Sequence, residues 1–340
     1  MAFEIPPLDP RRLAELSPFT DEAEQSTREF VRRFRLAPDE AARHHHERSL
    51  LGTLMGRAYP HAGPVELCLV TDWISCMLVL DDQFDETELG RDPDLLRRAC
   101  AEILGWLPVE GPGADAPPHE PVRFVPEVFR SAFSDLWNRL GLRTTPAWRA
   151  RMTAHLSAFF DTCVWESENR RSGRVPGIDE YLRMRRSALM PYLDLIEVTT
   201  RWEVPLDLYR LPDLTELNAA LSDADLWTND LFSCEKEILL GDQHNLVLVH
   251  LNAHGGSLQE SAREVARMTQ ERIDYFNELS GRFVARNLRD QADHALVQRM
   301  EAHLRGLASW LSGQNRWRHE TRRFDPGRPE VQDASGTTAL

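Results

Sequence analysis

The stretch Cys76-Met77-Leu78-Val79-Leu80-Asp81-Asp82-Gln83-Phe84-Asp85-Glu86 joins an apolar run directly to a cluster of carboxylates. Carboxylates this close together repel one another unless a cation holds them. On a helix, Asp81 and Asp85 lie about 40° apart around the axis with Asp82 beside them, so all three can point into one pocket. Mg²⁺ prefers oxygen ligands and is usually shared between one or two carboxylates and a substrate phosphate. The alternative is an acidic helix end on the surface, in a chain with 54 acidic residues.

A second set of oxygen ligands lies in the stretch Asn229–Glu237, NDLFSCEKE. Asn229, Ser233 and Glu237 are spaced at i, i+4 and i+8, which places them in one stripe about 12 Å long on a helix face. Asn and Ser are indifferent helix formers, so their alignment needs a reason other than helix propensity. A polar, solvated helix face is the alternative, but it does not account for two ligand sets in one chain. Together, the two sets predict a magnesium site for a diphosphate.

Helical periodicity extends over almost the whole chain, and no run shows the alternation typical of a strand, so we predict an all-α protein. We expect helices over 21–35, 39–58, 64–83, 92–105, 124–140, 146–168, 178–201, 214–239, 243–254, 257–284, 290–312 and 314–322. Prolines make 108–121 an exposed loop. The two acidic motifs lie on opposite sides of that loop and would have to meet in one cavity, so we predict a single domain over 1–324. A polar, flexible tail follows over 325–340.

Composition excludes several classes of function. A net charge of −14 and the lack of a block rich in Lys and Arg argue against nucleic-acid binding. No run approaches the roughly 20 apolar residues of a membrane span, and the N-terminus does not resemble a signal peptide. Five scattered cysteines indicate reduced thiols. We therefore expect a cytoplasmic protein with no membrane or nucleic-acid partner.

Other kinds of site have no support in the sequence. The run His44-His45-His46 cannot converge on a metal, because consecutive side chains splay around a helix, and we expect these residues to face solvent. The chain contains neither GxxxxGK[ST] nor GxGxxG, so a diphosphate has no glycine-rich loop to bind it. Binding of a diphosphate must then depend on metal ions.

The motif DDQFDE, followed about 150 positions later by NDLFSCEKE and then by GDQHNLVLV, resembles the bacterial class I terpene synthases. The resemblance extends from about residue 60 to residue 324. It implies a class I terpenoid synthase-like helical bundle around a central active-site cavity. It also implies a magnesium-dependent cyclase that ionises an isoprenyl diphosphate, cyclises the carbocation and releases diphosphate. Farnesyl diphosphate, giving a sesquiterpene, is the substrate we expect.

The resemblance also suggests which residues bind the diphosphate. The stretch Tyr181–Arg186, YLRMRR, is similar to the part of the family that carries a diphosphate-sensing arginine, and we assign that role to Arg185. Arg183 and Arg186 stay open as alternatives, because the segment up to Glu197 is about two residues shorter than the family pattern.

The C-terminal stretch Trp317–Phe324, WRHETRRF, resembles the family's closing arginine-tyrosine pair, with Arg323 as the arginine. Phe324 departs from the expected tyrosine and lacks the hydroxyl that would bond the diphosphate. Lys236 completes the implied set of diphosphate-binding cations, together with three Mg²⁺ ions. The alternatives to diphosphate binding are that Lys236 pairs with a neighbour on its helix and that Arg185 lies in solvent.

A carbocation needs a dry cavity and gains from aromatic faces. The candidate rings are Trp310, Trp317 and Tyr192, although any one tryptophan in a helical protein is more often an ordinary core residue.

Other functions remain as alternatives. A trans-isoprenyl diphosphate synthase would carry a second DDxxD motif, which this chain lacks. A monoterpene or diterpene cyclase of the same family, or a degenerate helical binding protein, also stays open. The sequence determines neither the product nor the oligomeric state. A homodimer is possible.

Overall fold

The computed structural model describes residues 4–110 and 124–324, apart from the side chains of Asp85 and Glu86. It is 75% helical and has no strand in these ranges, so the predicted all-α class is confirmed. The predicted tail, and most of the predicted proline-rich loop, lie outside the described residues. No described helix is long and apolar enough to cross a membrane.

The chain divides into two compact units. The first contains residues 1–18, 56–62 and 175–326, and the second contains 19–55, 63–174 and 327–340. Helix α3 (Leu51–Ala58) is divided between them. The single domain over 1–324 stays a prediction, and each unit is described by itself.

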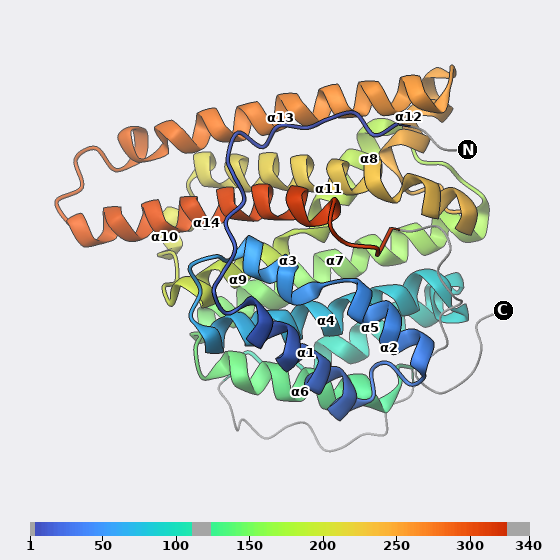
Figure 1. Ribbon diagram of the computed structural model, residues 1–340, viewed down its shortest axis with the longest axis horizontal. Helices are drawn as coiled ribbons and strands as arrows, with labels where there is room; N and C mark the ends of the chain where they lie inside the picture. Colours follow the sequence, from blue (N-terminus) through green and yellow to red (C-terminus); the bar gives the residue numbers. More distant parts are fainter. Residues whose placement is uncertain (1–3, 111–123, 325–340) are drawn as a thin grey trace. The chain divides into compact units, whose positions relative to one another are not determined.

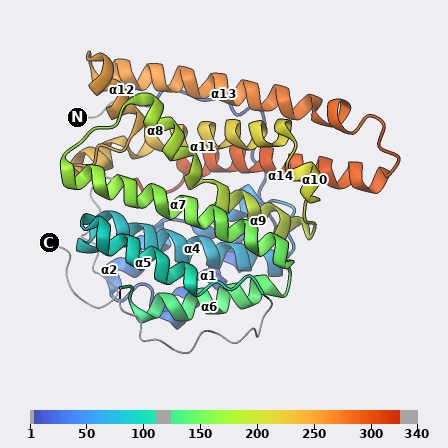
Figure 2. The same ribbon diagram turned by 180° about the vertical axis from the view of Figure 1, so that it is seen from behind.

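In the first unit, the long helix α11 packs along α13 and also contacts α14 (Figures 1 and 2). The helices of this unit are α8 (Ile178–Arg185), η2 (Arg186–Ala188), α9 (Met190–Thr200), α10 (Leu206–Tyr209), α11 (Pro212–Leu240), α12 (Leu246–His254), α13 (Leu258–Asn287) and α14 (His294–Arg318). Buried apolar side chains such as Leu217 and Leu221 of α11 and Phe276 of α13 build its core.

Local sequence sets the ends of these helices. Pro212 lies in the first turn of α11, where no backbone N–H is needed, and Gly241 ends the helix in a left-handed conformation with φ 74°. Asn245 begins α12 by accepting the backbone N–H of Val247. The stripe of polar ligands predicted on α11 therefore lies on one uninterrupted helix.

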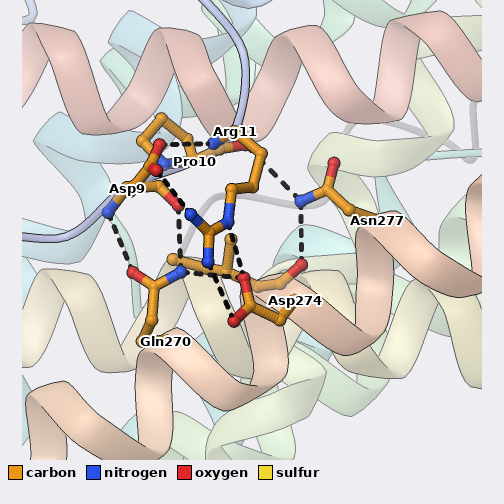
Figure 3. Close-up of polar contacts among 7 residues, drawn as sticks. Asp9, Pro10, Arg11, Gln270, Asp274 and Asn277 are labelled. Atoms are coloured by element: carbon orange, nitrogen blue, oxygen red, sulfur yellow. Dashed lines mark hydrogen bonds and ion pairs between the residues drawn. The ribbon is translucent and has the colours of Figure 1, made fainter.

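The N-terminal segment lies along α13 without forming a helix of its own (Figures 1 and 3). The Gln270 side chain accepts the N–H of Asp9 at 2.9 Å and donates to its carbonyl at 3.1 Å. Arg11 pairs with both oxygens of Asp274, at 2.9 and 3.2 Å, and the Asn277 amide donates to the carbonyl of Pro10. A side-chain amide here pairs with extended backbone as a neighbouring strand would.

In the second unit, α4 (Pro64–Glu86) contacts α1, α6 and η1, and α5 packs against α7. The remaining helices are α1 (Thr20–Phe34), α2 (Glu40–Arg48), η1 (Glu88–Arg91), α5 (Pro93–Gly105), α6 (Glu127–Gly141) and α7 (Pro146–Ser172). Trp73 of α4 and Phe133 of α6 are buried with ring centroids 5.8 Å apart. Helix α4 extends beyond the predicted end at residue 83, so the acidic cluster lies in its last turns.

Four of the predicted helices are divided or joined in the structure. The helix expected over 39–58 is two helices, α2 and α3, separated at Leu50, whose φ of 53° is left-handed. The helix expected over 178–201 is interrupted by the 3-10 turn η2. The helices expected over 290–312 and 314–322 are one helix, α14, and Gly313 inside it has no room for a side chain because the Arg57 backbone lies against it.

The expectation that His44–His46 face solvent is wrong for His46. This side chain is buried, and its Nε2 lies 2.9 Å from the Ser75 hydroxyl. The hydrogen bond satisfies the ring in a structural role. The five cysteines are free thiols, as expected.

Candidate functional site

The acidic cluster forms the C-terminal end of α4. Asp82 is buried, Asp81 is half-buried, and the predicted ligand Asp85 has a side chain outside the described residues. Phe84 lies between Asp82 and Asp85 in the sequence, and its buried ring packs on Phe160 of α7, with ring centroids 6.1 Å apart. This contact fixes the rotation of the last turns of α4, and with it the directions in which Asp81 and Asp82 point.

The turn that follows α4 holds this end of the helix. The Thr87 hydroxyl donates to the Gln83 carbonyl at 2.6 Å and accepts the N–H of Leu89 at 3.3 Å. One side chain therefore closes α4 and opens η1.

The second ligand set lies on α11 as a continuous stripe. Asn229 and Glu237 are half-buried, and Ser233 between them is buried. The Ser233 hydroxyl donates to the Asn229 carbonyl at 2.9 Å. Because its hydrogen is used in this way, the oxygen presents lone pairs outward, as a metal ligand must.

Arg185, the last residue of α8, lies at this stripe. Its Nη2 donates to Asn229 Oδ1 at 3.3 Å and to Asp230 Oδ1 at 3.1 Å. Arg186 pairs instead with Asp223, at 2.7 and 2.9 Å, and Arg183 is exposed. Of the three arginines that the sequence left open, Arg185 is the one in contact with the predicted metal ligands.

Asp230 is completely buried, and its carboxylate connects three segments of the first unit. It accepts from Arg185, from the Tyr181 hydroxyl at 2.7 Å and from the N–H of Leu246 at 3.0 Å. Burial raises the pKa of Asp230, whereas the Arg185 guanidinium lowers it. The carboxylate thus fixes α8 and the start of α12 against α11.

The Glu237 carboxylate lies in an environment suited to a cation. Burial, followed by the negative charges of Asp230 and Asp242, raises the pKa of Glu237 to about 8. Asn245 donates to its Oε2 at 2.7 Å. A carboxylate that neighbouring anions drive toward protonation ionises readily when a divalent ion binds, so these residues fit a metal site.

The closing segment packs against the same helix. The Phe324 ring lies 6.1 Å from the ring of Phe232 and 5.9 Å from that of Trp317. Phe232 is on α11 between Asn229 and Ser233. Because Phe324 contacts Phe232, the preceding residue, Arg323, also lies near the stripe. Lys236 is half-buried one residue before Glu237.

Two of the three predicted cavity rings lie together. Trp310 of α14 is stacked with Tyr192 of α9 at 6.2 Å and also contacts Tyr59 at 5.6 Å. The Tyr59 hydroxyl donates to the Tyr192 carbonyl at 2.9 Å, which orders the group. Trp317 instead packs against Phe324. Tyr59 lies outside every motif that predicted the site, so its place in this group was not predicted.

No three His, Cys, Asp or Glu side chains form a metal-binding group within residues 4–110 and 124–324. The stripe on α11 has one carboxylate, with an amide and a hydroxyl. In the α4 cluster, the third carboxylate is that of Asp85. No sequence pattern identified Asp230 as a partner of Arg185, and Asn245, within GDQHNLVLV, had no predicted role.

Comparisons with known proteins identify the family of this chain. Residues 72–274 match the family described as terpene synthase family 2, C-terminal metal binding. The chain is 31% identical to a (+)-T-muurolol synthase, described as (2E,6E)-farnesyl diphosphate cyclizing, from Roseiflexus castenholzii, covering 92% of this chain and 91% of the relative. It is 30% identical to a (-)-delta-cadinene synthase from Streptomyces clavuligerus, over 81% of each chain.

Among solved structures, the chain is similar to germacradien-4-ol synthase from Streptomyces citricolor. The TM-score is 0.77 at 25% identity, covering 94% of this chain and 99% of that one. The family match, which spans both the acidic end of α4 and the stripe on α11, and the identity to curated relatives lead to one conclusion: the chain belongs to terpene synthase family 2, the metal-binding terpene synthases.

Proposed function

We propose that the protein is a magnesium-dependent terpene cyclase that ionises farnesyl diphosphate, cyclises the carbocation to a sesquiterpene and releases diphosphate. The observation that carries this proposal is the stripe of Asn229, Ser233 and Glu237 on α11, with Arg185 hydrogen-bonded to its first member. Farnesyl diphosphate is supported by the (+)-T-muurolol synthase relative, which is described as cyclizing (2E,6E)-farnesyl diphosphate.

The metal ligands in this proposal are the two sets of oxygen donors. Asp81, Asp82 and Asp85 form one set, and Asn229, Ser233 and Glu237 form the other; three Mg²⁺ ions are expected. Bound Mg²⁺ supplies the positive charge that stabilises the departing diphosphate. Arg185, Lys236 and Arg323 add cationic donors to the phosphate oxygens.

The protein itself prepares this chemistry by holding its donors in place before substrate arrives. Arg185 is held by the buried Asp230, so its guanidinium does not have to be ordered at the moment of reaction. The aromatic group of Trp310, Tyr192 and Tyr59 presents ring faces that can stabilise a carbocation.

Three further features belong to the same proposal. The catalytic domain extends over 1–324 and the remaining residues form a tail. The enzyme acts in the cytoplasm. A homodimer stays open as its oligomeric state, and sedimentation would test it directly.

Incubation with farnesyl diphosphate and Mg²⁺, followed by extraction and gas chromatography, tests the reaction. A cyclic hydrocarbon or terpene alcohol supports the proposal, whereas a longer diphosphate would indicate chain elongation. We expect Asp82→Ala or Asn229→Ala to abolish turnover with an unchanged circular dichroism spectrum. Asp94→Ala is the matched control, because Asp94 is an exposed aspartate that pairs only with surface arginines in the described contacts.

The three related substrates also separate the remaining functions. Turnover of geranyl diphosphate alone would identify a monoterpene cyclase, and turnover of geranylgeranyl diphosphate alone would identify a diterpene cyclase. If none of the three substrates is turned over, the remaining function is that of a helical binding protein.

A further inference from the structure

Asn245, which begins α12, makes more contacts than a helix cap requires. Its Oδ1 accepts the N–H of Val247 at 2.9 Å, which is the ordinary capping bond. Its Nδ2 donates to the carbonyl of Asp230 at 2.6 Å and to Oε2 of Glu237 at 2.7 Å. The side chain is completely buried.

The partners of Asn245 fix the orientation of its amide. The backbone N–H of Val247 can only donate, so it must meet the amide oxygen, and the Asp230 carbonyl can only accept, so it must meet the amide nitrogen. A flipped amide would place donor against donor and acceptor against acceptor in a site without exposed surface. The donor directed at Glu237 is therefore set by backbone groups that do not move with the side chain.

The two hydrogens of this amide connect separate parts of the ligand stripe. One goes to the residue that follows Asn229, and the other goes to the carboxylate of Glu237, about two turns further along α11. Engaging Oε2 selects one rotamer of the glutamate and leaves Oε1 to bind a metal ion. Glutamate has three rotatable side-chain bonds, so without this donor its carboxylate would have to be ordered when the ion binds.

We propose that Asn245 is a positioning residue for the metal site, which orients the Glu237 carboxylate toward Mg²⁺. The inference rests on the proposed function, because it takes Glu237 as a metal ligand. Hydrogen-bond partners of metal ligands are worth 10–100-fold in metal affinity when removed, so we expect a change of about 10-fold or more here.

Serine separates the two roles of Asn245. Serine caps helices about as well as asparagine does, but its side chain is too short to reach Glu237. We expect Asn245→Ser to raise the Kd for inorganic diphosphate in excess Mg²⁺, measured by calorimetry, by about 10-fold or more. The Mg²⁺ concentration for half-maximal turnover should rise by a similar factor. The bond from Asn245 to the Asp230 carbonyl is lost as well, so the melting temperature should fall by a few degrees, and the affinity is measured well below the unfolding transition.

A double-mutant cycle tests whether the effect passes through the glutamate. If Asn245 acts by orienting Glu237, adding Asn245→Ser to Glu237→Ala, which removes the acceptor, costs no further affinity for magnesium diphosphate. Asn245→Thr, also a capping residue, provides a second test if the serine variant does not fold. Asp293→Ser on α14 is the control, because Asp293 is a cap that accepts only the N–H groups of Ala295 and Leu296 in the described contacts.

The outcomes distinguish the two proposals. Wild-type affinity in Asn245→Ser, or full additivity in the cycle, would overturn the positioning role and leave Asn245 as a helix cap. If the unchanged protein neither binds magnesium diphosphate nor turns over farnesyl diphosphate, the proposed function fails as well.

Discussion

Gly90 lies where the chain turns back onto the end of α4. A Cβ at this position would lie 1.3 Å from the carbonyl oxygen of Phe84 and 2.5 Å from its carbonyl carbon. Both atoms are backbone, so no side-chain rotation can relieve the clash. Gly90→Ala therefore tests how closely the acidic cluster depends on this turn.

The size of the required shift follows from ordinary contact distances. The two atoms would have to separate by roughly 2 Å to reach van der Waals contact, which begins at 3.4 Å. Phe84 cannot yield freely because its ring is buried against Phe160. Overpacking of this kind costs about 1–3 kcal/mol of stability. Metal sites tolerate only about 0.2 Å in ligand distance, and a misplacement of about 1 Å can cost 10²-fold in rate.

We expect Gly90→Ala to lower kcat/KM for farnesyl diphosphate by about 10²-fold or more while the protein stays folded. The assay measures product formation over a range of Mg²⁺ concentrations, with circular dichroism and thermal unfolding in parallel. Excess Mg²⁺ should restore activity only in part, because the geometry of the ligands is altered rather than their chemical identity.

Gly281→Ala is the matched control. Gly281 lies inside α13, where an added Cβ meets nothing within 4 Å, so the same substitution should stabilise the protein by about 0.5–1 kcal/mol. If Gly90→Ala were as active as Gly281→Ala, the turn after α4 would not position the aspartates, and the reasoning would be refuted.

Three further changes probe other parts of the protein. Phe324→Tyr should leave turnover unharmed, since the ring contacts survive and a hydroxyl is added; a large loss in kcat would show that the closing pair is misplaced. Burial raises the pKa of Asp72 from 3.8 to about 6, against the pull of Arg139 at 2.8 Å. The folded pKa lies above the unfolded value, so the ionised carboxylate costs stability as pH rises through this window. Asp72→Asn should therefore gain up to roughly 3 kcal/mol relative to the parent between about pH 4 and pH 7.5. Urea unfolding across pH measures this difference, and a difference independent of pH would contradict the cause assigned to the pKa. Trp310→Leu, compared with Trp310→Phe, should increase early-quenched acyclic products in gas chromatography, because it removes the ring stacked on Tyr192; identical product profiles would assign Trp310 to the core alone.

The helices could be predicted because their signals are local. A periodicity of 3.6 residues needs only neighbouring side chains, and it identified the all-α class and the long helix that carries Asn229, Ser233 and Glu237. The interruptions could not be predicted in the same way. Leu50 adopts a left-handed conformation that leucine rarely favours. Gly313, inside α14, lies against the backbone of Arg57, which leaves no room for a side chain. The approach at Gly313 is a contact between segments distant in sequence, which a local pattern does not contain.

The candidate site divides along the same line. Ligands on one helix could be read from their spacing, because spacing along a helix determines direction. The choice among Arg183, Arg185 and Arg186 could not be made from spacing, since a shift of one residue turns a side chain by about 100°. The structure supplies the missing contact, from Arg185 to Asn229 and Asp230.

Asp230 explains how one arginine can serve a site whose ligands change partners. In the proposed mechanism, Asn229 Oδ1 binds a metal ion and can no longer accept a hydrogen bond from Arg185 freely. Asp230 is completely buried and keeps its own bonds to Tyr181 and to the N–H of Leu246, so its carboxylate stays in place. Arg185 therefore retains a fixed anionic partner whether or not Asn229 is engaged. Its guanidinium then keeps the same position when the diphosphate binds.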